Sequence, residues 1–233
     1  MASPNKLVRF KSIEVEDVFE KEDQLIKQVQ SGQLSKALIL WQAKKPTLVL
    51  PSGKKWPQSD QLTNALQTLG WQLAARKTGG APVPQLPGII NLSYIYQWPN
   101  EHPYDIQLSY QNLCSVLTQF FISLGIKTDI HATPYSYCDG DYNLNIKGKK
   151  VVGTAQRVVI KRDGGRVVLS QACIIVDANM NTVTQPVNLC NQLCGHSNKI
   201  IADVHTALLS HTNQRPSIDA LFQALTKAFL DSA

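Results

Sequence analysis

A cysteine and a lysine twelve positions apart are the residues of this sequence whose types and spacing could do covalent chemistry. Cys138 stands in the turn-like run Tyr-Cys-Asp-Gly-Asp, and Lys150 follows across a strand-like run at 142–146. A hairpin-like return would bring the two side chains together. A nearby ammonium favours the nucleophilic thiolate and could stabilise charge developing on an acyl oxygen. The alternative, which the spacing alone leaves open, is a surface cysteine near an unrelated lysine.

A stretch rich in glycine and proline, at 77–88, could hold an anionic or acyl group. Arg76 and Thr78 stand close to the pair Gly79-Gly80. Paired glycines let the backbone approach a ligand closely, and nearby N–H groups and cations can then hold a carboxylate or phosphate. The alternative is a surface loop interrupted by prolines. The loop lacks the Gly-Lys-Ser/Thr ending of a P-loop, and no Gly-x-Gly-x-x-Gly is present, so neither nucleotide-binding motif is expected.

The cysteines favour packing over metal binding. Cys190, Cys194 and His196 form the one Cys/His cluster of the sequence. A structural zinc site normally has four ligands, and the two cysteines lie one turn apart on an apolar helix face, so we predict core packing and no metal. Cys114, within an apolar helical pattern, is interpreted in the same way. The odd total of five cysteines favours free thiols in a reducing compartment.

Composition indicates an ordinary globular protein. The 233 residues, 43% hydrophobic and 17% charged, suit one domain over 1–233 with a substantial core. No apolar run could span a membrane and the N-terminus lacks a secretory h-region, so we expect a cytoplasmic protein without a membrane partner. The net charge of +6 favours an acidic partner. The basic residues are scattered and form no basic helix, so we expect no nucleic-acid partner.

Hydrophobic periodicity predicts an alternation of helices and strands. Helices are expected at 14–31, 58–70, 105–125, 186–194, 198–211 and 217–230. Strands are expected at 37–42, 47–51, 71–76, 88–97, 127–132 and 141–148, followed by a hairpin around Asp163-Gly164-Gly165. Because strict β-α-β alternation is missing, the pattern predicts an α/β or α+β domain with a mixed sheet and a helical C-terminal end from about residue 186.

Two motifs resemble a known family. KTGGAPVPQLPGIINLS (77–93) resembles the Arg-Arg-x-Gly-Gly-Gly…Gly-Asn/Leu-Asn-x-Ser segment of the lipoate–protein ligases, and KGKKVVGTAQR (147–157) resembles their Gly-Arg/Lys-Lys-x-x-Gly-x-Ala-Gln-Arg motif. RVVLSQACIIVD (166–177) continues the match, and the resemblance runs to about residue 210. It implies the biotin/lipoate-ligase catalytic fold, a mixed β-sheet flanked by helices and related to class II aminoacyl-tRNA synthetase cores.

The same resemblance implies roles for individual residues. Lys150 would contact the acyl carbonyl region, and the loop around Arg76 would line the acyl pocket. Ala81 replaces the family's third glycine. The substrate-binding residues implied by the two motifs are Arg76, Thr78, Gly79, Gly80, Asn91, Gly153, Thr154 and Ala155.

The family contains ATP-dependent ligases and cysteine-dependent transferases. The amidotransferase branch has Tyr-Cys-Pro-Gly-x-Tyr-Asp before its Gly-Lys-Lys motif, and this chain has Tyr-Cys-Asp-Gly-Asp-Tyr-Asn at 137–143. Asp139 replaces the proline, and a carboxylate beside a thiol disfavours the thiolate. The helical end after the hairpin is shorter than the extra domain that many ligases carry, which favours the transferase branch.

Three hypotheses follow. In the first, Cys138 takes an octanoyl or lipoyl group as a thioester and passes it, without a cofactor, to a lysine of an acidic lipoyl-carrier domain, an H protein or a 2-oxoacid dehydrogenase subunit. In the second, the protein is an ATP- and Mg-dependent ligase that converts lipoate or octanoate to an acyl-adenylate. In the third, it is a non-catalytic acyl- or carrier-binding module, for which Asp139 and Ala81 are the support.

Overall fold

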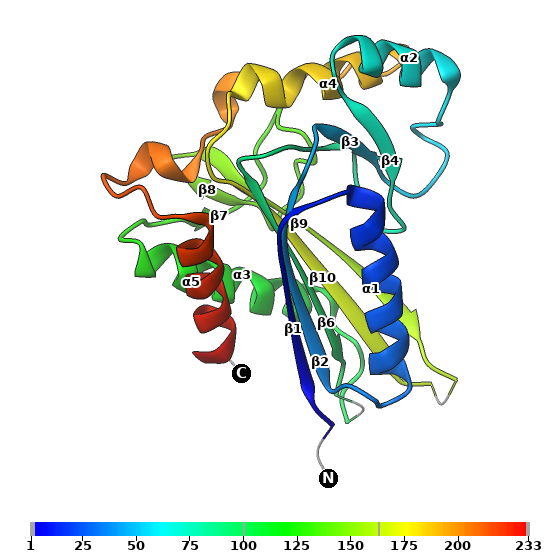
Figure 1. The fold of residues 1–233 in the computed structure, drawn as a ribbon, viewed down its shortest axis with the longest axis vertical. Helices are drawn as coiled ribbons and strands as arrows, with labels where there is room; N and C mark the ends of the chain where they lie inside the picture. The colour runs from blue at the N-terminus through cyan, green and yellow to red at the C-terminus, as the bar shows by residue number, and fades with distance from the viewer. Residues whose placement is uncertain (1–2, 100, 163, 232–233) are drawn as a thin grey trace.

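A seven-stranded mixed sheet forms the centre of the fold. The computed structural model describes residues 3–99, 101–162 and 164–231. The strand order is β1-β2-β6-β10-β9-β8-β7 (Figure 1), in which β1 and β2 are parallel and the other pairs are antiparallel. The strands are β1 (Asn5–Ile13), β2 (Lys36–Ala43), β6 (Ile89–Gln97), β10 (Arg166–Ile175), β9 (Lys149–Ile160), β8 (Leu144–Ile146) and β7 (Asp129–Ile130).

A smaller sheet of three strands, in the order β4-β3-β5, lies beside one end of the main sheet. Figure 1 shows this small sheet below two helices at the top of the molecule. The apolar side chains of the small sheet, of the two helices and of the nearby ends of β6 and β10 form one core cluster. The elements are β3 (Thr47–Leu50), β4 (Gln72–Ala75), β5 (Val83–Gln85), α2 (Asp60–Thr68) and α4 (Met180–Leu193).

The two faces of the main sheet bury different helices, because successive strand residues point to opposite faces. In β2, Leu38 and Leu40 pack against α3 (Ile106–Ser123) and α5 (Ile218–Asp231). Ile39 and Trp41, which alternate with them, pack against α1 (Val15–Gln30) on the other face. The apolar run at 37–41 in β2 therefore identifies a sheet covered on both sides, and this fold confirms the predicted mixed sheet flanked by helices.

The predicted helical end is only partly correct. Helix α4 begins at Met180, six positions before the predicted start at 186. The predicted helix over 198–211 is wrong: the segment forms two short 3₁₀ turns, Ala202–Val204 and Leu208–His211. Its backbone bonds to distant partners instead, since the Thr206 N–H donates to the Lys150 carbonyl and the Leu209 N–H to the Val176 carbonyl. Tertiary pairing therefore replaces the local bonds of a helix.

The strands also differ from the expectation at several places. β1 was not predicted, because most of its side chains are exposed and it lies at the edge of the sheet. β5 lies inside the stretch predicted to be irregular, and β7 and β8 are shorter than the ranges 127–132 and 141–148. The hairpin between β9 and β10 is confirmed by their antiparallel pairing, although Asp163 of its turn lies outside the described residues.

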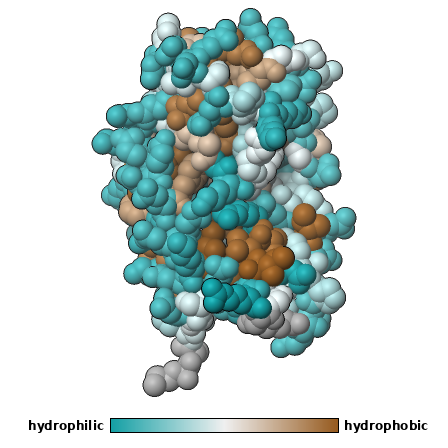
Figure 2. Space-filling model, turned by 90° about the vertical axis from the view of Figure 1, so that its right-hand side faces the viewer, coloured by the Kyte–Doolittle hydropathy of each residue, from teal (hydrophilic) through white to brown (hydrophobic). Residues whose placement is uncertain are grey.

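Figure 2 views the molecule from the side that carries α1. Figure 2 shows this side as mainly hydrophilic, with hydrophobic side chains gathered in separate areas. Scattered apolar groups of this kind are ordinary on a protein surface. In the part of the chain that the structure describes, no helix combines the length and the apolar character needed to cross a membrane.

Gly88 is the glycine at which the fold leaves no room for a side chain. Its φ is +95°, and a Cβ there would lie 1.9 Å from the Asp177 carbonyl oxygen. The close approach exists because the Gly88 carbonyl accepts bonds from the N–H groups of Val176 and Asp177, each at 2.9 Å. We predict that Gly88→Ala lowers the free energy of unfolding by about 3 kcal/mol or more.

Gly70→Ala is the matched control for this prediction, measured in the same urea titration. Gly70 has a similar positive φ of +77° but open space around it, so its substitution should cost only about 1 kcal/mol. Equal losses in the two variants would contradict the assigned role of the contact with Asp177.

Candidate active site

A pocket of about 550 Å³, including its open mouth, lies between the main sheet, α1 and the small sheet. Phe19 of α1 and Trp41 of β2 form part of one wall, and Val83 of β5 forms part of the wall opposite. The floor is the face of β6, β10 and β9 that the small sheet covers. Two cross-strand rows make this floor: Asn91, Cys173 and Gly153, and next to them Ser93, Gln171 and Ala155. Glycine and alanine on β9 keep the floor low at that side.

Cys138 lies at one end of this pocket, on the turn between β7 and β8. Its φ of 50° is in the left-handed region, which non-glycine residues seldom adopt. A Cβ placed on Gly80 would lie 3.1 Å from the Cys138 Sγ and 3.2 Å from the Arg76 Nη2. The thiol and the guanidinium therefore converge on the backbone of Gly80, where only glycine leaves space for both.

Lys150 is fully buried behind the cysteine turn. Its Nζ donates to the carbonyl oxygen of Tyr137 and, at 2.7 Å, to that of Cys138, and it lies 4.5 Å from the centre of the Tyr137 ring. Burial lowers its pKa to about 8, and the charge of Cys138 is the largest influence in the opposite direction. The Asn143 side chain donates to the same Cys138 carbonyl at 3.0 Å. These bonds hold the left-handed turn in place.

His205 supports the same turn, although its position along the chain carried no signal of this role. Its ring stacks on the Tyr137 ring with 4.9 Å between centroids. Its Nε2 accepts from the Tyr137 N–H at 3.3 Å, while Nδ1 donates to the Ile201 carbonyl at 2.9 Å. Burial, together with the charge of Lys150, lowers the pKa of His205 to about 4, so at neutral pH the imidazole is uncharged and does not compete with the ammonium.

Arg76 shapes the glycine loop from within. Its Nη2 donates to the carbonyl oxygens of Gly79 at 2.9 Å and Ala81 at 3.0 Å, and its Nη1 donates to the Val49 carbonyl at 3.3 Å. Burial lowers the pKa of Arg76 below its ordinary value, and the charge of Cys138 acts against this shift. The guanidinium thus joins the loop to the small sheet and also lines the pocket.

Glu22 is, like Lys150, a buried side chain that can carry a charge, but no role was predicted for it from the sequence. It occupies a buried position of α1, where the helical period places Val18, Leu25 and Ile26, and a charge within such a period was the available signal. Its Oε1 accepts from the Ser93 hydroxyl and from Gln171 Nε2 at 2.8 Å. Burial raises its pKa to about 7.

The residues singled out from the sequence take different positions around the pocket. Cys138, Arg76, Asn91, Gly153, Thr154 and Ala155 line it. Thr78, Gly79 and Gly80 belong to the loop above it, and Lys150 lies behind the cysteine turn. The structure thus gathers these residues in one region, and their roles in a reaction stay predictions.

Cys114, Cys190 and Cys194 pack as predicted. Cys114 and Cys190 are fully buried in apolar clusters, and Cys194 packs against the second of these. The His196 ring lies beside Trp56, and its Nε2 is 2.9 Å from the Lys55 carbonyl oxygen. Among the described residues, no group of three or more His, Cys, Asp or Glu is arranged to hold a metal ion.

Comparison with known families decides the classification. The model of the lipoyl protein ligase A/B catalytic domain matches residues 14–230, which include the pocket, the cysteine turn and both motifs. The chain belongs to this family. The match extends through α5, beyond the stretch over which the resemblance was traced.

Curated relatives share part of the chain. An octanoyl-[GcvH]:protein N-octanoyltransferase of Geobacillus kaustophilus is 27% identical over 67% of this chain and 54% of the relative. A lipoyl-[GcvH]:protein N-lipoyltransferase of Listeria monocytogenes is 27% identical over 61% of this chain and 51% of the relative. The chain thus spans about half the length of the curated relatives it matches.

Solved structures share the fold over nearly the whole chain. Lipoate-protein ligase A bound with ATP superposes with a TM-score of 0.77 at 15% identity, covering 99% of this chain and 85% of that one. A putative lipoate protein ligase from T. acidophilum with bound lipoic acid gives a TM-score of 0.73 at 15% identity, covering 100% and 86%. At these identities the comparison establishes the lipoate-ligase fold and nothing further.

The raised pKa of Glu22 predicts a dependence of stability on pH. A carboxyl group with a folded pKa of about 7 and an ordinary value of 4.5 contributes stability that is fully present below pH 4.5 and lost as pH rises through 7. The free energy of unfolding of Glu22→Gln, taken relative to that of the wild type, should therefore rise by about 2 kcal/mol between pH 5 and pH 8. Urea unfolding at both pH values measures it. If the free energies of unfolding of the wild type and of Glu22→Gln differ by the same amount at both pH values, the raised pKa of Glu22 is contradicted.

Proposed function

We propose that the protein is an acyltransferase that moves an octanoyl or lipoyl group, through a thioester at Cys138, to a lysine of a lipoyl-carrier protein. One observation carries the proposal: a half-buried thiol stands at the end of an apolar-walled pocket, in a turn stabilised by a buried ammonium. The similarity to octanoyl and lipoyl transferases named for GcvH substrates supports this substrate class and a carrier of that kind.

The reaction has two balanced steps. In the first, the Cys138 sulfur adds to the acyl carbonyl carbon, the bond from that carbon to the donor nitrogen or sulfur breaks, and the donor leaves with the thiol proton. In the second, the neutral amine of the acceptor lysine attacks the thioester, an amide forms, and the thiol is restored with the amine proton. The thioester divides one difficult transfer into two easier ones.

Two cations support these steps from different sides. The Lys150 ammonium is bonded to the Cys138 carbonyl, so it holds the turn and places positive charge beside the residue that becomes a thiolate. The Arg76 guanidinium approaches the sulfur from the glycine loop. Positive charge at both places stabilises the oxygen of the tetrahedral intermediate.

The pocket walls suit an unbranched acyl chain. Phe19, Trp41 and Val83 supply apolar contacts along the pocket, and burying a chain of methylene groups gives about 0.8 kcal/mol for each group removed from water. Cys173 also lines the pocket, but burial raises its pKa to about 11. Its thiol therefore stays protonated at neutral pH.

The alternative function is an ATP-dependent ligase that forms an acyl-adenylate from lipoate or octanoate. The specific observation in its favour is the buried Lys150 next to the pocket, since a cation there would serve an adenylate as well as a thioester. This reading requires no sulfur at position 138, so the two functions make opposite predictions for its removal.

Intact-mass spectrometry after incubation with an octanoylated carrier protein tests the proposal. We expect one octanoyl adduct on the wild type, none on Cys138→Ala, and an unchanged adduct on Cys194→Ala, which removes a thiol that does not line the pocket. An adduct that persists in Cys138→Ala would contradict the thioester. ATP–pyrophosphate exchange that survives in Cys138→Ala would establish the ligase reaction in its place.

Lys150→Met keeps the side-chain length and removes the charge. We predict a loss of about 100-fold or more in kcat for octanoyl transfer. The carbonyls of Tyr137 and Cys138 lose the ammonium group that donates to them, so the cysteine turn is no longer held in the same position. The neighbouring Lys149→Met is the control, since Lys149 is exposed. Comparable rates in the two lysine variants, at equal folded fractions by circular dichroism, would count against the role of Lys150.

A further inference from the structure

The glycine loop at 76–81 belongs to the small sheet, while the pocket floor belongs to the main sheet. The loop follows β4 and leads to β5, and the Thr78 carbonyl accepts from the Ser52 N–H at 3.0 Å on the small-sheet side. The pocket lies between the two sheets, so its shape depends on what joins the loop to the opposite side.

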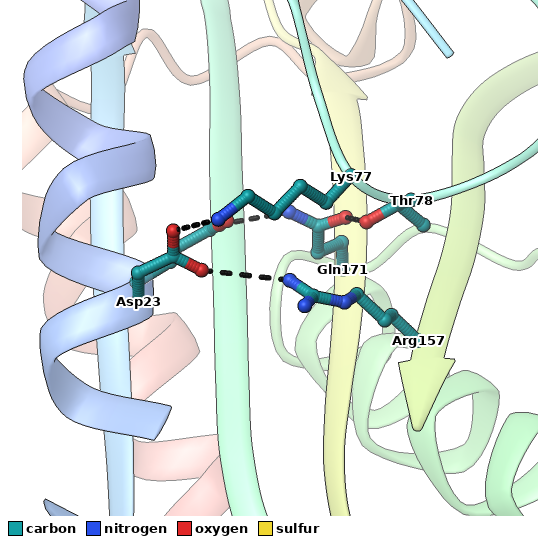
Figure 3. A network of polar contacts seen from close by, with 6 residues as sticks. Asp23, Lys77, Thr78, Arg157 and Gln171 are labelled. Atoms are coloured by element: carbon teal, nitrogen blue, oxygen red, sulfur yellow. Dashed lines mark hydrogen bonds and ion pairs between the residues drawn. The ribbon is translucent and has the colours of Figure 1, made fainter. Parts of the chain in front are cut away.

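An inner chain of hydrogen bonds makes that connection. The buried Thr78 hydroxyl donates to Gln171 Oε1 at 2.8 Å, and Gln171 Nε2 donates to Glu22 Oε1 at 2.8 Å. The Ser93 hydroxyl donates to the same carboxyl oxygen. The chain thus runs from the loop to β10, then to α1 and β6, and Figure 3 shows Thr78 and Gln171 pointing toward each other.

An outer ion pair runs beside it. Lys77 Nζ pairs with one oxygen of Asp23 on α1, and Arg157 of β9 approaches the other oxygen at 3.5 Å. Figure 3 shows both cations directed at Asp23. The outer pair is partly exposed and therefore contributes little alone, whereas the inner chain is buried, so an unmade bond in it is costly.

We propose that Thr78, Gln171 and Glu22 are positioning residues that fasten the glycine loop across the pocket and so set its affinity for the acyl group. This inference rests on the proposed acyl transfer for its substrate. The same loop contains Gly80, whose backbone faces the Cys138 sulfur. Glu22 is the centre of this unit, because α1, β6 and β10 meet at its carboxyl group.

Thr78→Val tests the inner chain, because valine keeps the shape and removes the hydroxyl. We expect the KM for an octanoylated carrier to rise about tenfold with kcat within about twofold. We also expect backbone amides at 77–81 to exchange hydrogen about tenfold faster. Thr78→Ser, which restores the hydroxyl, should recover both values. Thr118→Val is the matched control, since its buried hydroxyl on α3 has no hydrogen-bond partner, and it should change neither.

Glu22 offers a second and independent comparison. In Glu22→Gln the amide oxygen can accept the same two bonds, so the KM and the exchange at 77–81 should stay within about twofold of wild type at pH 6. Glu22→Leu removes the acceptor and should match Thr78→Val. Unchanged exchange in Thr78→Val, or a Thr78→Ser variant as impaired as Thr78→Val, would overturn the positioning role.

Different results would contradict the proposed acyl transfer and the positioning role of the inner chain. If the wild type forms no adduct with the octanoylated carrier and binds no octanoate by calorimetry, the proposed function fails. The exchange measurements, made without a ligand, then decide whether the inner chain fastens the loop. If the wild type transfers octanoyl and the Thr78→Val kinetics match those of Thr118→Val, the proposed function stands and the positioning role fails.

Discussion

The buried ammonium of Lys150 is the interaction on which the arrangement of the site depends. A charge removed from water must be compensated, and here the carbonyls of Tyr137 and Cys138 and the face of an aromatic ring provide the compensation. Since both carbonyls belong to the cysteine turn, the requirement to satisfy the charge fixes the turn. Gly153 makes this possible, because a Cβ there would lie 3.2 Å from the lysine Cε and 3.3 Å from its Nζ.

The pocket, on the other side of the cysteine turn, also follows from what has to be buried. The main sheet needs cover on both faces, and α1 covers only part of one face, so the small sheet covers the rest and leaves a gap between the two sheets. The polar groups that line this gap bond to each other across it, with Gln171 between Thr78 and Glu22. A buried network in which the donors are matched rigidifies the parts it joins.

Particular residues show how far sequence patterns reach. The continuous apolar run that contains Leu38, Ile39, Leu40 and Trp41 predicted a buried strand, and both faces of that strand are buried. The segment 198–211 has helix-forming residues, but its N–H groups bond to distant carbonyls, and no local pattern records such partners. Glu22 is similar: its place in the helical period was a signal of burial that was not used, and its partners come from strands more than 70 positions away.

The sequence by itself determined the family, the mixed sheet and the pair of motifs, because periodicity and turn chemistry are local properties that short segments express. Only the tertiary structure decided that Lys150 bonds to the backbone of the cysteine turn, that Arg76 and the Cys138 sulfur both face Gly80, and that His205 supports Tyr137. The physical reason is that burial and hydrogen-bond partners depend on which distant segments pack together, and spacing along the chain does not encode that packing.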